Sequence, residues 1–396
     1  GTGLEDGAET EEIDWGEGNR PHSGGERKSE DYYTVLILGR DTGGGGNTDT
    51  MLLASYDVTN QKATVMSIPR DTMVNVPYDI KRINAVYNYG GGGDEGIQYL
   101  YKEISQLVGF EPDYQVVVEW DAVGEIVDAM GGVWFDVPRN MNYDDPYQDL
   151  HIHQEKGYRL LSGDDAMQVL RYRHDNDMHY GYPDGDLGRI KTQQAFLSAM
   201  VEQLLKLENV TKIRQFIQVF QDNVETDLSF QNILWFAKKA VFGGLSMENV
   251  EFVTMPNKNV SAWSRTYQSY QSYVVPIADE LLDLVNNQLS PFTKVFTLSD
   301  LDIMSVNSDG SLSSSTGRVE DSRAAQPPVR PSQAQHAGAA GGGDAHGWMR
   351  TAMPIDRRRS ASGNSRKICE RGGQRYCACR RWSNTRAPRM RRRLAG

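Results

Sequence analysis

The sequence has little cysteine, and what it has lies at one end. Its three cysteines, Cys369, Cys377 and Cys379, all fall near the C-terminus of the 396-residue chain. A thiol nucleophile is therefore excluded from the body of the protein. A body without cysteine suits an oxidising or surface location, where stray thiols mispair, and it is compatible with export.

Long apolar segments are also missing. No run approaches the roughly eighteen residues that a membrane-spanning helix needs, and no signal peptide opens the chain. The chain starts at Gly1 without a methionine, so we expect that an N-terminal anchor has been removed. The missing targeting segment therefore does not indicate cytoplasmic residence.

Charge is divided unevenly along the chain. Residues 318–396 hold 17 arginines and one lysine against five acidic residues, a net charge of +13. The whole chain has a net charge of −11, so residues 1–317 carry −24. Because it lacks a periodic apolar pattern, we predict that the segment 301–396 is a disordered basic tail. Two interpretations stay open: a patch that binds anionic polymer or nucleic acid, and an unstructured, non-native extension. We favour the extension, since the abrupt change to arginine-dominated sequence is unusual within one evolved domain.

Between an acidic linker and this tail, the sequence predicts one α/β domain. Residues 1–30 are acidic, glycine-rich and nearly free of aliphatic side chains, which predicts a flexible linker. Over residues 31–300, short β-branched runs alternate with amphipathic stretches, which favours an α/β layer architecture. The predicted strands are 32–39, 51–57, 62–68, 113–120, 133–137 and 250–255, and the predicted helices lie near 95–108, up to Met130, 187–207, 228–242 and 275–287.

Four polar clusters fall at predicted strand ends and loops, where sites on α/β sheets usually lie. In the first, Asp41 and Asp49 flank a four-glycine loop. Glycines let the backbone approach a phosphate, and carboxylate oxygens suit Mg²⁺, which also takes oxygens from phosphates. A glycine-rich hairpin with solvated aspartates is the alternative. The motif is neither a P-loop nor a dinucleotide fingerprint.

The second and third clusters supply an Arg-Asp pair and two further cations. Arg70 and Asp71 follow a strand in the string SIPRDT, and Lys81 and Arg82 come one short loop later. The planar fork of arginine matches phosphate oxygens, and Asp71 is suited to orient it or to act as a base. The alternative is a surface ion pair.

The fourth cluster is the most informative. Arg171 and Arg173 lie at the end of one predicted helix, and Arg189 and Gln193 lie at the start of another. Arg189 and Gln193 are four residues apart, so they share a helix face and can reach one ligand. Arginines gathered at loops and helix starts of an acidic body indicate an anion-binding site.

Taken in order, these motifs resemble the LytR-CpsA-Psr family over about residues 31–300. The strings that carry the resemblance are GRD after the first strand, NTDTM, SIPRDT, RINAVYNYGG, DAMGGVWFDVP, LSGDDAMQVLRYR and GDLGRIKTQQ. The resemblance implies a three-layer α-β-α sandwich with a central mixed β-sheet and a hydrophobic pocket for a polyprenyl chain. It also implies a phosphotransferase that attaches an anionic glycopolymer, such as teichoic acid or capsule, from a polyprenyl-pyrophosphate carrier to peptidoglycan. We then expect an extracellular location, with the protein held to the cytoplasmic membrane surface by an N-terminal helix.

The resemblance also assigns roles to single residues. Asp41 and Asp49 are similar to aspartates linked to Mg²⁺ (or Mn²⁺), Arg70 matches a phosphate-binding arginine, and Asp41 or Asp71 is the candidate base. The implied pyrophosphate ligands are Arg70, Lys81, Arg82, Arg171, Arg173, Arg189 and Gln193.

Two features depart from the family pattern. Asn47 stands where the family usually has arginine, so one cation is missing beside Asp49, and residues 174–184 are longer than the usual connection. Two other functions would use the same residues: a polyprenyl-pyrophosphate hydrolase, and a non-catalytic module that binds polyprenyl lipid. Nucleic-acid binding is opposed by the −24 body, which repels phosphate backbones.

Overall fold

The computed structural model describes residues 24–40, 47–147, 149–207, 210–325 and 327. Asp41 and most of the basic tail lie outside these residues, so the predictions on them stay as made. Within the described part of the chain, no helix has both the length and the apolarity needed to cross a bilayer.

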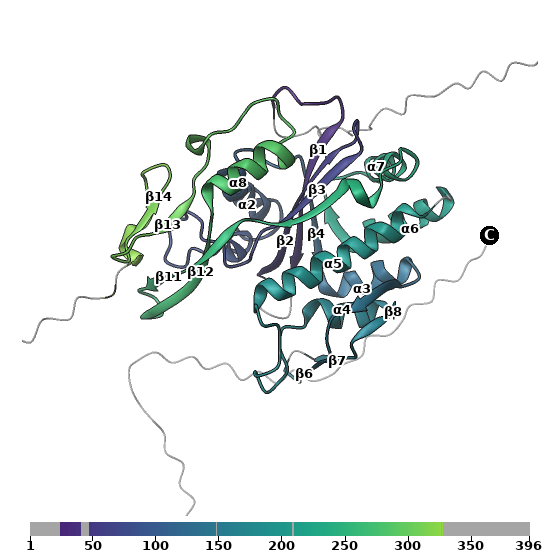
Figure 1. Ribbon diagram of the computed structural model, residues 1–396, viewed down its shortest axis with the longest axis horizontal. Helices are drawn as coiled ribbons and strands as arrows, with labels where there is room; N and C mark the ends of the chain where they lie inside the picture. Colours follow the sequence, from purple (N-terminus) through teal and green to yellow (C-terminus); the bar gives the residue numbers. More distant parts are fainter. Residues whose placement is uncertain (1–23, 41–46, 148, 208–209, 326, 328–396) are drawn as a thin grey trace, which may run out of the picture. The chain divides into compact units, whose positions relative to one another are not determined.

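A six-stranded mixed sheet forms the centre of the fold (Figure 1). Its strand order is β10-β3-β2-β1-β4-β9, with β1 antiparallel to β2 and parallel to β4, and β3 parallel to β10. Residues on both faces of the central strands are apolar, as burial on both sides requires. The strands are β1 (Tyr32–Arg40), β2 (Thr48–Asp57), β3 (Lys62–Ser67), β4 (Tyr114–Glu119), β9 (Val224–Thr226) and β10 (Val250–Thr254).

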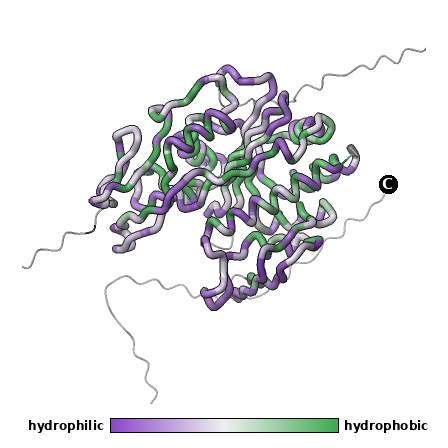
Figure 2. Tube along the Cα trace, in the orientation of Figure 1, coloured by the Kyte–Doolittle hydropathy of each residue, from purple (hydrophilic) through white to green (hydrophobic). Residues whose placement is uncertain are grey.

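Helices cover both faces of this sheet. Leu36 and Leu38 of β1 face a core shared with α2 (Gly93–Val108) and α8 (Ala278–Leu284), while Tyr33 and Val35 face a core shared with α7 (Phe230–Phe242). The second face also carries α5 (Asp186–Leu205) and α6 (Val210–Asn223). Figure 1 shows these two helical layers on opposite sides of the strands, and Figure 2 shows hydrophobic colour concentrated between them. The predicted three-layer α-β-α sandwich with a central mixed sheet is therefore confirmed.

Beside the sheet, a second core is built from one face of α5, two further helices and two short β-ribbons. Phe135, Tyr172 and Phe196 of α5 belong to it. Ser162 and Asp165 form a capping box at the start of α4. The elements are α3 (Trp120–Ala129), α4 (Gly163–Arg171), β5 (Val133–Val137) paired with β8 (Gly157–Leu161), and β6 (Met141–Asp145) paired with β7 (Leu150–Gln154).

Two antiparallel β-ribbons lie where a helix start and a disordered segment were predicted. The helix predicted over 275–287 begins only at Ala278, because 269–276 pairs as β12 (Ser269–Pro276) with β11 (Asn257–Ser264). Disorder from residue 301 onward is wrong for 301–325, where β13 (Met304–Val306) pairs with β14 (Leu312–Ser314). Met304 and Leu312 are buried, and this burial offsets the entropy of ordering the segment.

Short helical turns complete the structure. They are η1 (Ile83–Ala85), α1 (Val86–Tyr89), η2 (Met247–Asn249), η3 (Val285–Leu289), η4 (Leu298–Asp300) and η5 (Ser322–Ala325). Helix α6 was missed by the sequence analysis.

The start of the described chain is also ordered, so the linker predicted over 1–30 is wrong for 24–30. Arg27 donates through both terminal nitrogens to the carboxylate of Asp113, at 2.8 and 2.6 Å. Asp113 is fully buried and also accepts from the backbone N–H of Thr34 at 2.9 Å. A bidentate pair of this kind fixes the segment onto the first residues of β1 and β4.

Helix α2 carries an acid in its buried face. Glu103 is 4% exposed, and its Oε2 has no hydrogen-bond partner among the described residues. Burial raises the pKa of Glu103 to about 7 from an ordinary 4.5. The folded state therefore prefers the neutral acid. Burial of Glu103 costs no stability while the acid is neutral at low pH, and it lowers the free energy of unfolding as the pH rises through 7.

We expect Glu103→Gln to relieve this loss. The variant should match the wild type near pH 4.5 and be more stable at pH 8, by roughly 3 kcal/mol if the whole shift is expressed. Denaturant unfolding at both pH values measures the difference. An equal difference at both values would contradict the assignment of the buried acid.

Candidate functional site

Three arginines from separate elements meet at Asp49 in β2. The Asp49 carboxylate Oδ1 lies 2.5 Å from Nη1 of Arg70 and 3.5 Å from Nη2 of Arg173. Arg189 donates from Nη2 to the backbone carbonyl of Asp49 at 3.4 Å. The register of β1 on β2 shifts between Gly39 and Arg40, so the sheet is irregular beside this cluster.

Local structure explains why the arginines converge. The pairing of Leu52 with Ser67 sets the end of β3 beside β2, and the turn after Pro69 then projects Arg70 toward Asp49. Arg173 follows the C-cap of α4, where the backbone becomes extended. Arg189 lies in the first turn of α5 and pairs with Asp186 at 2.6 Å, three residues earlier.

Burial differs strongly among these cations. Arg189 is 2% exposed, whereas the Arg173 side chain is 46% exposed. Burial lowers the pKa of Arg189 below its ordinary value, while Asp186 and Asp49 raise it. Within the described residues, Nε of Arg189 is buried without an acceptor. Since buried donors are almost always paired, this N–H is available to a bound anion or water.

Gln193 fixes the helix that carries Arg189. Its Oε1 accepts from the Thr50 hydroxyl at 3.2 Å, and its Nε2 donates to the carbonyl of Leu170 at 3.2 Å. The expected shared helix face is thus present, and Gln193 links β2, α4 and α5. Gln194, which was not predicted as a site residue, donates to the Ser67 hydroxyl at 2.9 Å and ties α5 to β3.

Asp71 extends the cluster to Arg82. Oδ1 of Asp71 lies 3.9 Å from Nε of Arg70 and 3.4 Å from Nε of Arg82. Arg82 also donates from Nη2 to the carbonyl of Ser272 at 2.9 Å and lies over the ring of Tyr273. These contacts hold its guanidinium at one edge of the cluster.

Lys81 does not join this cluster. The residue is 1% exposed, and its Nζ donates to the carbonyl of Val76 at 2.5 Å. Burial lowers the pKa of Lys81. Lys81 pairs through its backbone with Val74, and alternation along this strand-like segment directs the lysine inward and Arg82 outward. The expectation that Lys81 binds phosphate is therefore not supported. Arg171 is half-buried in the last turn of α4.

Arg40 is a site cation that the sequence analysis did not propose. It ends β1, lies 4.7 Å above the ring of Tyr87 and donates from Nη2 to Oδ1 of Asn88 at 3.4 Å. Asn88 in turn donates to Oδ1 of Asn47 at 3.4 Å. A cation therefore lies near Asn47, where the family pattern would have placed an arginine. Its position at a strand end directly before Asp41 was the signal that could have identified it.

Among the predicted metal ligands, Asp49 is the one that lies within the described residues. No group of three or more histidine, cysteine or acidic residues able to hold a metal occurs in the described ranges. Asp49 gives Oδ1 to Arg70 and Arg173, which leaves Oδ2 for another partner. A carboxylate oxygen beside an anion-binding arginine cluster suits a magnesium ion that shares phosphate oxygens.

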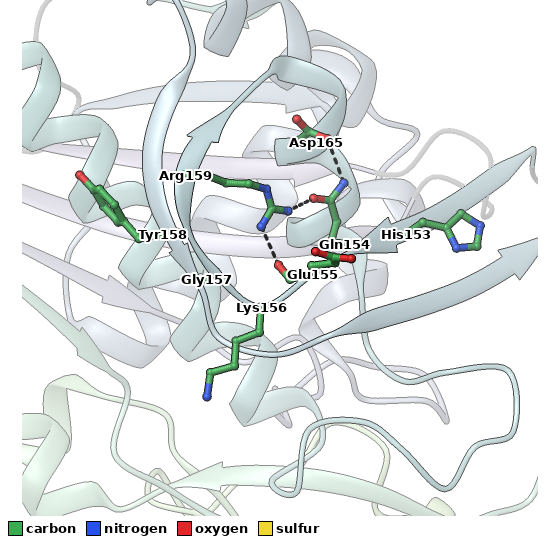
Figure 3. Close-up of a pocket in the computed structure, with 8 residues that line it drawn as sticks. All are labelled: His153, Gln154, Glu155, Lys156, Gly157, Tyr158, Arg159 and Asp165. Atoms are coloured by element: carbon green, nitrogen blue, oxygen red, sulfur yellow. Dashed lines mark hydrogen bonds between the residues drawn. The ribbon is translucent and has the colours of Figure 1, made fainter.

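A pocket of about 480 Å³ at the turn between β7 and β8 lies outside this cluster (Figure 3). Its Arg159 donates to the carbonyl of Glu155 at 2.6 Å and to the side chain of Gln154, which itself donates to Asp165. Because these polar groups satisfy one another, the pocket offers less to an anion than the Asp49 cluster does.

The Asp49 cluster can bind and stabilise charge. Four arginines face three carboxylates, and the set occupies an otherwise strongly acidic body. The four arginines are Arg70, Arg82, Arg173 and Arg189. The planar guanidinium groups match phosphate oxygens. Their attraction to an anion is stronger in a partly buried site than in water.

The profile of the LytR_cpsA_psr family matches residues 5–286. Among curated proteins, regulatory protein MsrR of Staphylococcus aureus is 27% identical over 237 residues, covering 59% of this chain and 67% of that protein. The polyisoprenyl-teichoic acid–peptidoglycan teichoic acid transferase TagU of Enterococcus faecalis is 25% identical over 232 residues, covering 56% of this chain and 71% of that protein.

Two solved structures show the same fold. Bacillus subtilis TagV has a TM-score of 0.54 at 23% identity, covering 65% of this chain and 95% of that one. TagT bound to LIIa-WTA has a TM-score of 0.51 at 19% identity, covering 69% of this chain and 97% of that one.

Proposed function

Because the chain belongs to the LytR-CpsA-Psr family, we propose that it transfers an anionic cell-wall glycopolymer from a polyprenyl-pyrophosphate carrier to peptidoglycan. The observation that carries the proposal is the meeting of Arg70, Arg173 and Arg189 at Asp49. A diphosphate is the substrate group that such a set of donors fits best. The name of the Enterococcus faecalis relative, a teichoic acid transferase, supports teichoic acid as the polymer.

The reaction exchanges the phosphoanhydride bond of the carrier for a phosphoester bond to the acceptor. A hydroxyl oxygen of the acceptor sugar attacks the phosphorus next to the polymer, the bond from that phosphorus to the bridging oxygen breaks, and polyprenyl phosphate leaves. The hydroxyl proton passes to a carboxylate, for which Asp71 and Asp41 are our candidates. Such a reaction needs little covalent chemistry from the protein, so catalysis rests on position and charge.

The described residues divide this work. Arg189, buried and with a spare N–H, is suited to hold an oxygen of the diphosphate throughout the reaction. Arg70, held between Asp49 and Asp71, is suited to neutralise negative charge on the oxygens of the phosphorus being attacked, because its planar fork matches phosphate oxygens. Arg173, whose side chain is 46% exposed, is suited to contact the substrate from the solvent side.

We further propose that Mg²⁺ (or Mn²⁺) binds through Asp49 and Asp41. When bound, the ion supplies positive charge to the phosphate oxygens and helps the leaving phosphate. We also propose the extracellular location, the N-terminal membrane anchor and a hydrophobic pocket for the polyprenyl chain. The carrier is membrane-bound, which is the reason for all three.

The test is release of polyprenyl phosphate from a synthetic polyprenyl-pyrophosphoryl sugar with Mg²⁺, with and without a peptidoglycan acceptor. We expect release to require the acceptor, with the sugar recovered on peptidoglycan. Release at the same rate without acceptor would replace the transferase with a hydrolase. Lipid binding without any release would show a non-catalytic module.

A further inference from the structure

Three tyrosines form an exposed aromatic surface beside the start of α2. The ring of Tyr89 stacks on Tyr78 with centroids 4.1 Å apart and meets the edge of Tyr99 at 6.4 Å. Tyr89 is 61% exposed and Tyr99 is 51% exposed. We call Tyr78, Tyr89 and Tyr99 the tyrosine surface. Exposed aromatic groups gathered in this way commonly mark interaction sites.

The tyrosine surface is continuous with the arginine site through one turn of helix. Successive residues of α1 serve both: the ring of Tyr87 lies under Arg40, Asn88 contacts Arg40 and Asn47, and Tyr89 faces solvent. The contact of Asn88 with Asn47, two residues before Asp49, connects the helical turn that carries Tyr89 to the strand that carries Asp49.

A glycine turn keeps the space beside the rings open. The turn spans residues 90–93, and Gly91, Gly92 and Gly93 have φ values of +88°, +71° and +56°, which favour glycine. A Cβ at Gly90 would come within 2.8 Å of the Tyr99 ring, whereas one at Gly93 would meet no described atom within 4 Å. The turn thus packs closely against Tyr99, whose side chain still remains 51% exposed.

The chemistry of the surface fits uncharged sugar. Aromatic rings with a hydroxyl at the edge offer an apolar face for the C–H groups of a pyranose and a polar rim for its hydroxyls. The hydroxyl of Tyr78 is buried, so Tyr78 supports Tyr89 from beneath, and the exposed rings of Tyr89 and Tyr99 are the ones that a sugar can reach. The first turn of α2 adds Asp94 and Glu95, which oppose an anionic polymer at this place.

We propose that the tyrosine surface binds the neutral glycan backbone of the acceptor, next to the sugar whose hydroxyl attacks. The proposal rests on the transferase function. It assigns donor and acceptor to different sides of one site: the diphosphate to the arginines, and the acceptor sugars to Tyr89 and Tyr99.

The experiment measures binding and turnover separately. Binding of neutral β-1,4-linked N-acetylglucosamine oligosaccharides, which share the uncharged sugar backbone of the acceptor, is measured by calorimetry for the wild type, Tyr89→Ala, Tyr99→Ala and Tyr89→Trp. Tyr147→Ala is the matched control, because Tyr147 is 99% exposed. We expect each tyrosine-to-alanine change to weaken glycan binding about five- to tenfold, as loss of one stacked ring predicts, with Tyr89→Trp near wild type.

Turnover distinguishes this inference from the proposed function. We expect Tyr89→Ala and Tyr99→Ala to raise the KM for the acceptor while the KM for the polyprenyl donor stays unchanged. If glycan binding depends on the tyrosines but the protein transfers no polymer, the inference about the tyrosine surface stands and the proposed transferase function is rejected. Wild-type glycan affinity in both alanine variants, or a loss of donor affinity instead, would overturn the inference.

Discussion

Arg70→Ala is expected to lower kcat for polymer transfer by about 10²- to 10³-fold, the usual cost of removing one donor that stabilises transition-state charge. Arg70 lies 2.5 Å from Asp49 and 3.9 Å from Asp71, so the substitution removes the cation between the two carboxylates. Arg70→Lys should recover only part of the rate, because a lysine ammonium lacks the planar fork. Steady-state release of polyprenyl phosphate measures both variants.

Arg214→Ala is the matched control for charge, since Arg214 is exposed on α6. It should leave the rate unchanged. If Arg70→Ala kept a kcat within about threefold of wild type while Arg214→Ala behaved the same, transition-state stabilisation by Arg70 would be rejected. A rise in donor KM with unchanged kcat would instead assign Arg70 to ground-state binding.

Asp49→Asn should reduce transfer on the order of 10²-fold or more and also change the arginine cluster itself. The asparagine keeps the shape but removes the charge that holds Arg70 and Arg173 together, so two like charges then repel each other. It also removes the carboxylate that we propose for the metal. Titration of Mn²⁺ followed by electron paramagnetic resonance should show weaker binding in the variant.

Asp184→Asn is the control for this variant, because Asp184 pairs with Lys191 at 3.0 Å outside the Asp49 contacts. Its Mn²⁺ binding and activity should match the wild type. Unchanged Mn²⁺ affinity in Asp49→Asn would remove the metal role and leave Asp49 as an organiser of arginines only. Unchanged activity would remove both roles.

Local sequence identified the central elements and most of the cluster. Alternating and continuous apolar runs predicted β1, β2, β3, β4 and β10 close to their observed bounds, because strand periodicity depends on neighbouring residues alone. The four-residue spacing of Arg189 and Gln193 predicted their shared helix face, which the structure has. Asp49, Arg70 and Arg173 were predicted to belong to one site, and the structure brings them together.

Other features depend on contacts between distant segments. Lys81 and Arg82 are adjacent cations in the sequence, yet Lys81 is buried and Arg82 lies at the Asp49 cluster. The backbone pairing of their segment with Val74 decides which way each side chain points. Residues 301–325 looked unstructured because their few apolar side chains become buried only against distant segments. Leu301 and Ile303 join the core of α2 and α8, and Met304 and Leu312 pack against β11 and β12. Arg40 showed no role until α1 placed Tyr87 and Asn88 against it.

The sequence by itself therefore determined the family, the layer architecture and the basic side chains that are suited to a diphosphate. The family and the diphosphate are what the resemblance of the ordered motifs implies, the layer architecture follows from the alternation of apolar patterns, and the gathered arginines by themselves indicate an anion site. The tertiary structure decided which of those cations share a carboxylate, which are buried, and that three tyrosines lie beside them. Strand register and burial set these relations between segments far apart in the chain, and no local pattern encodes them.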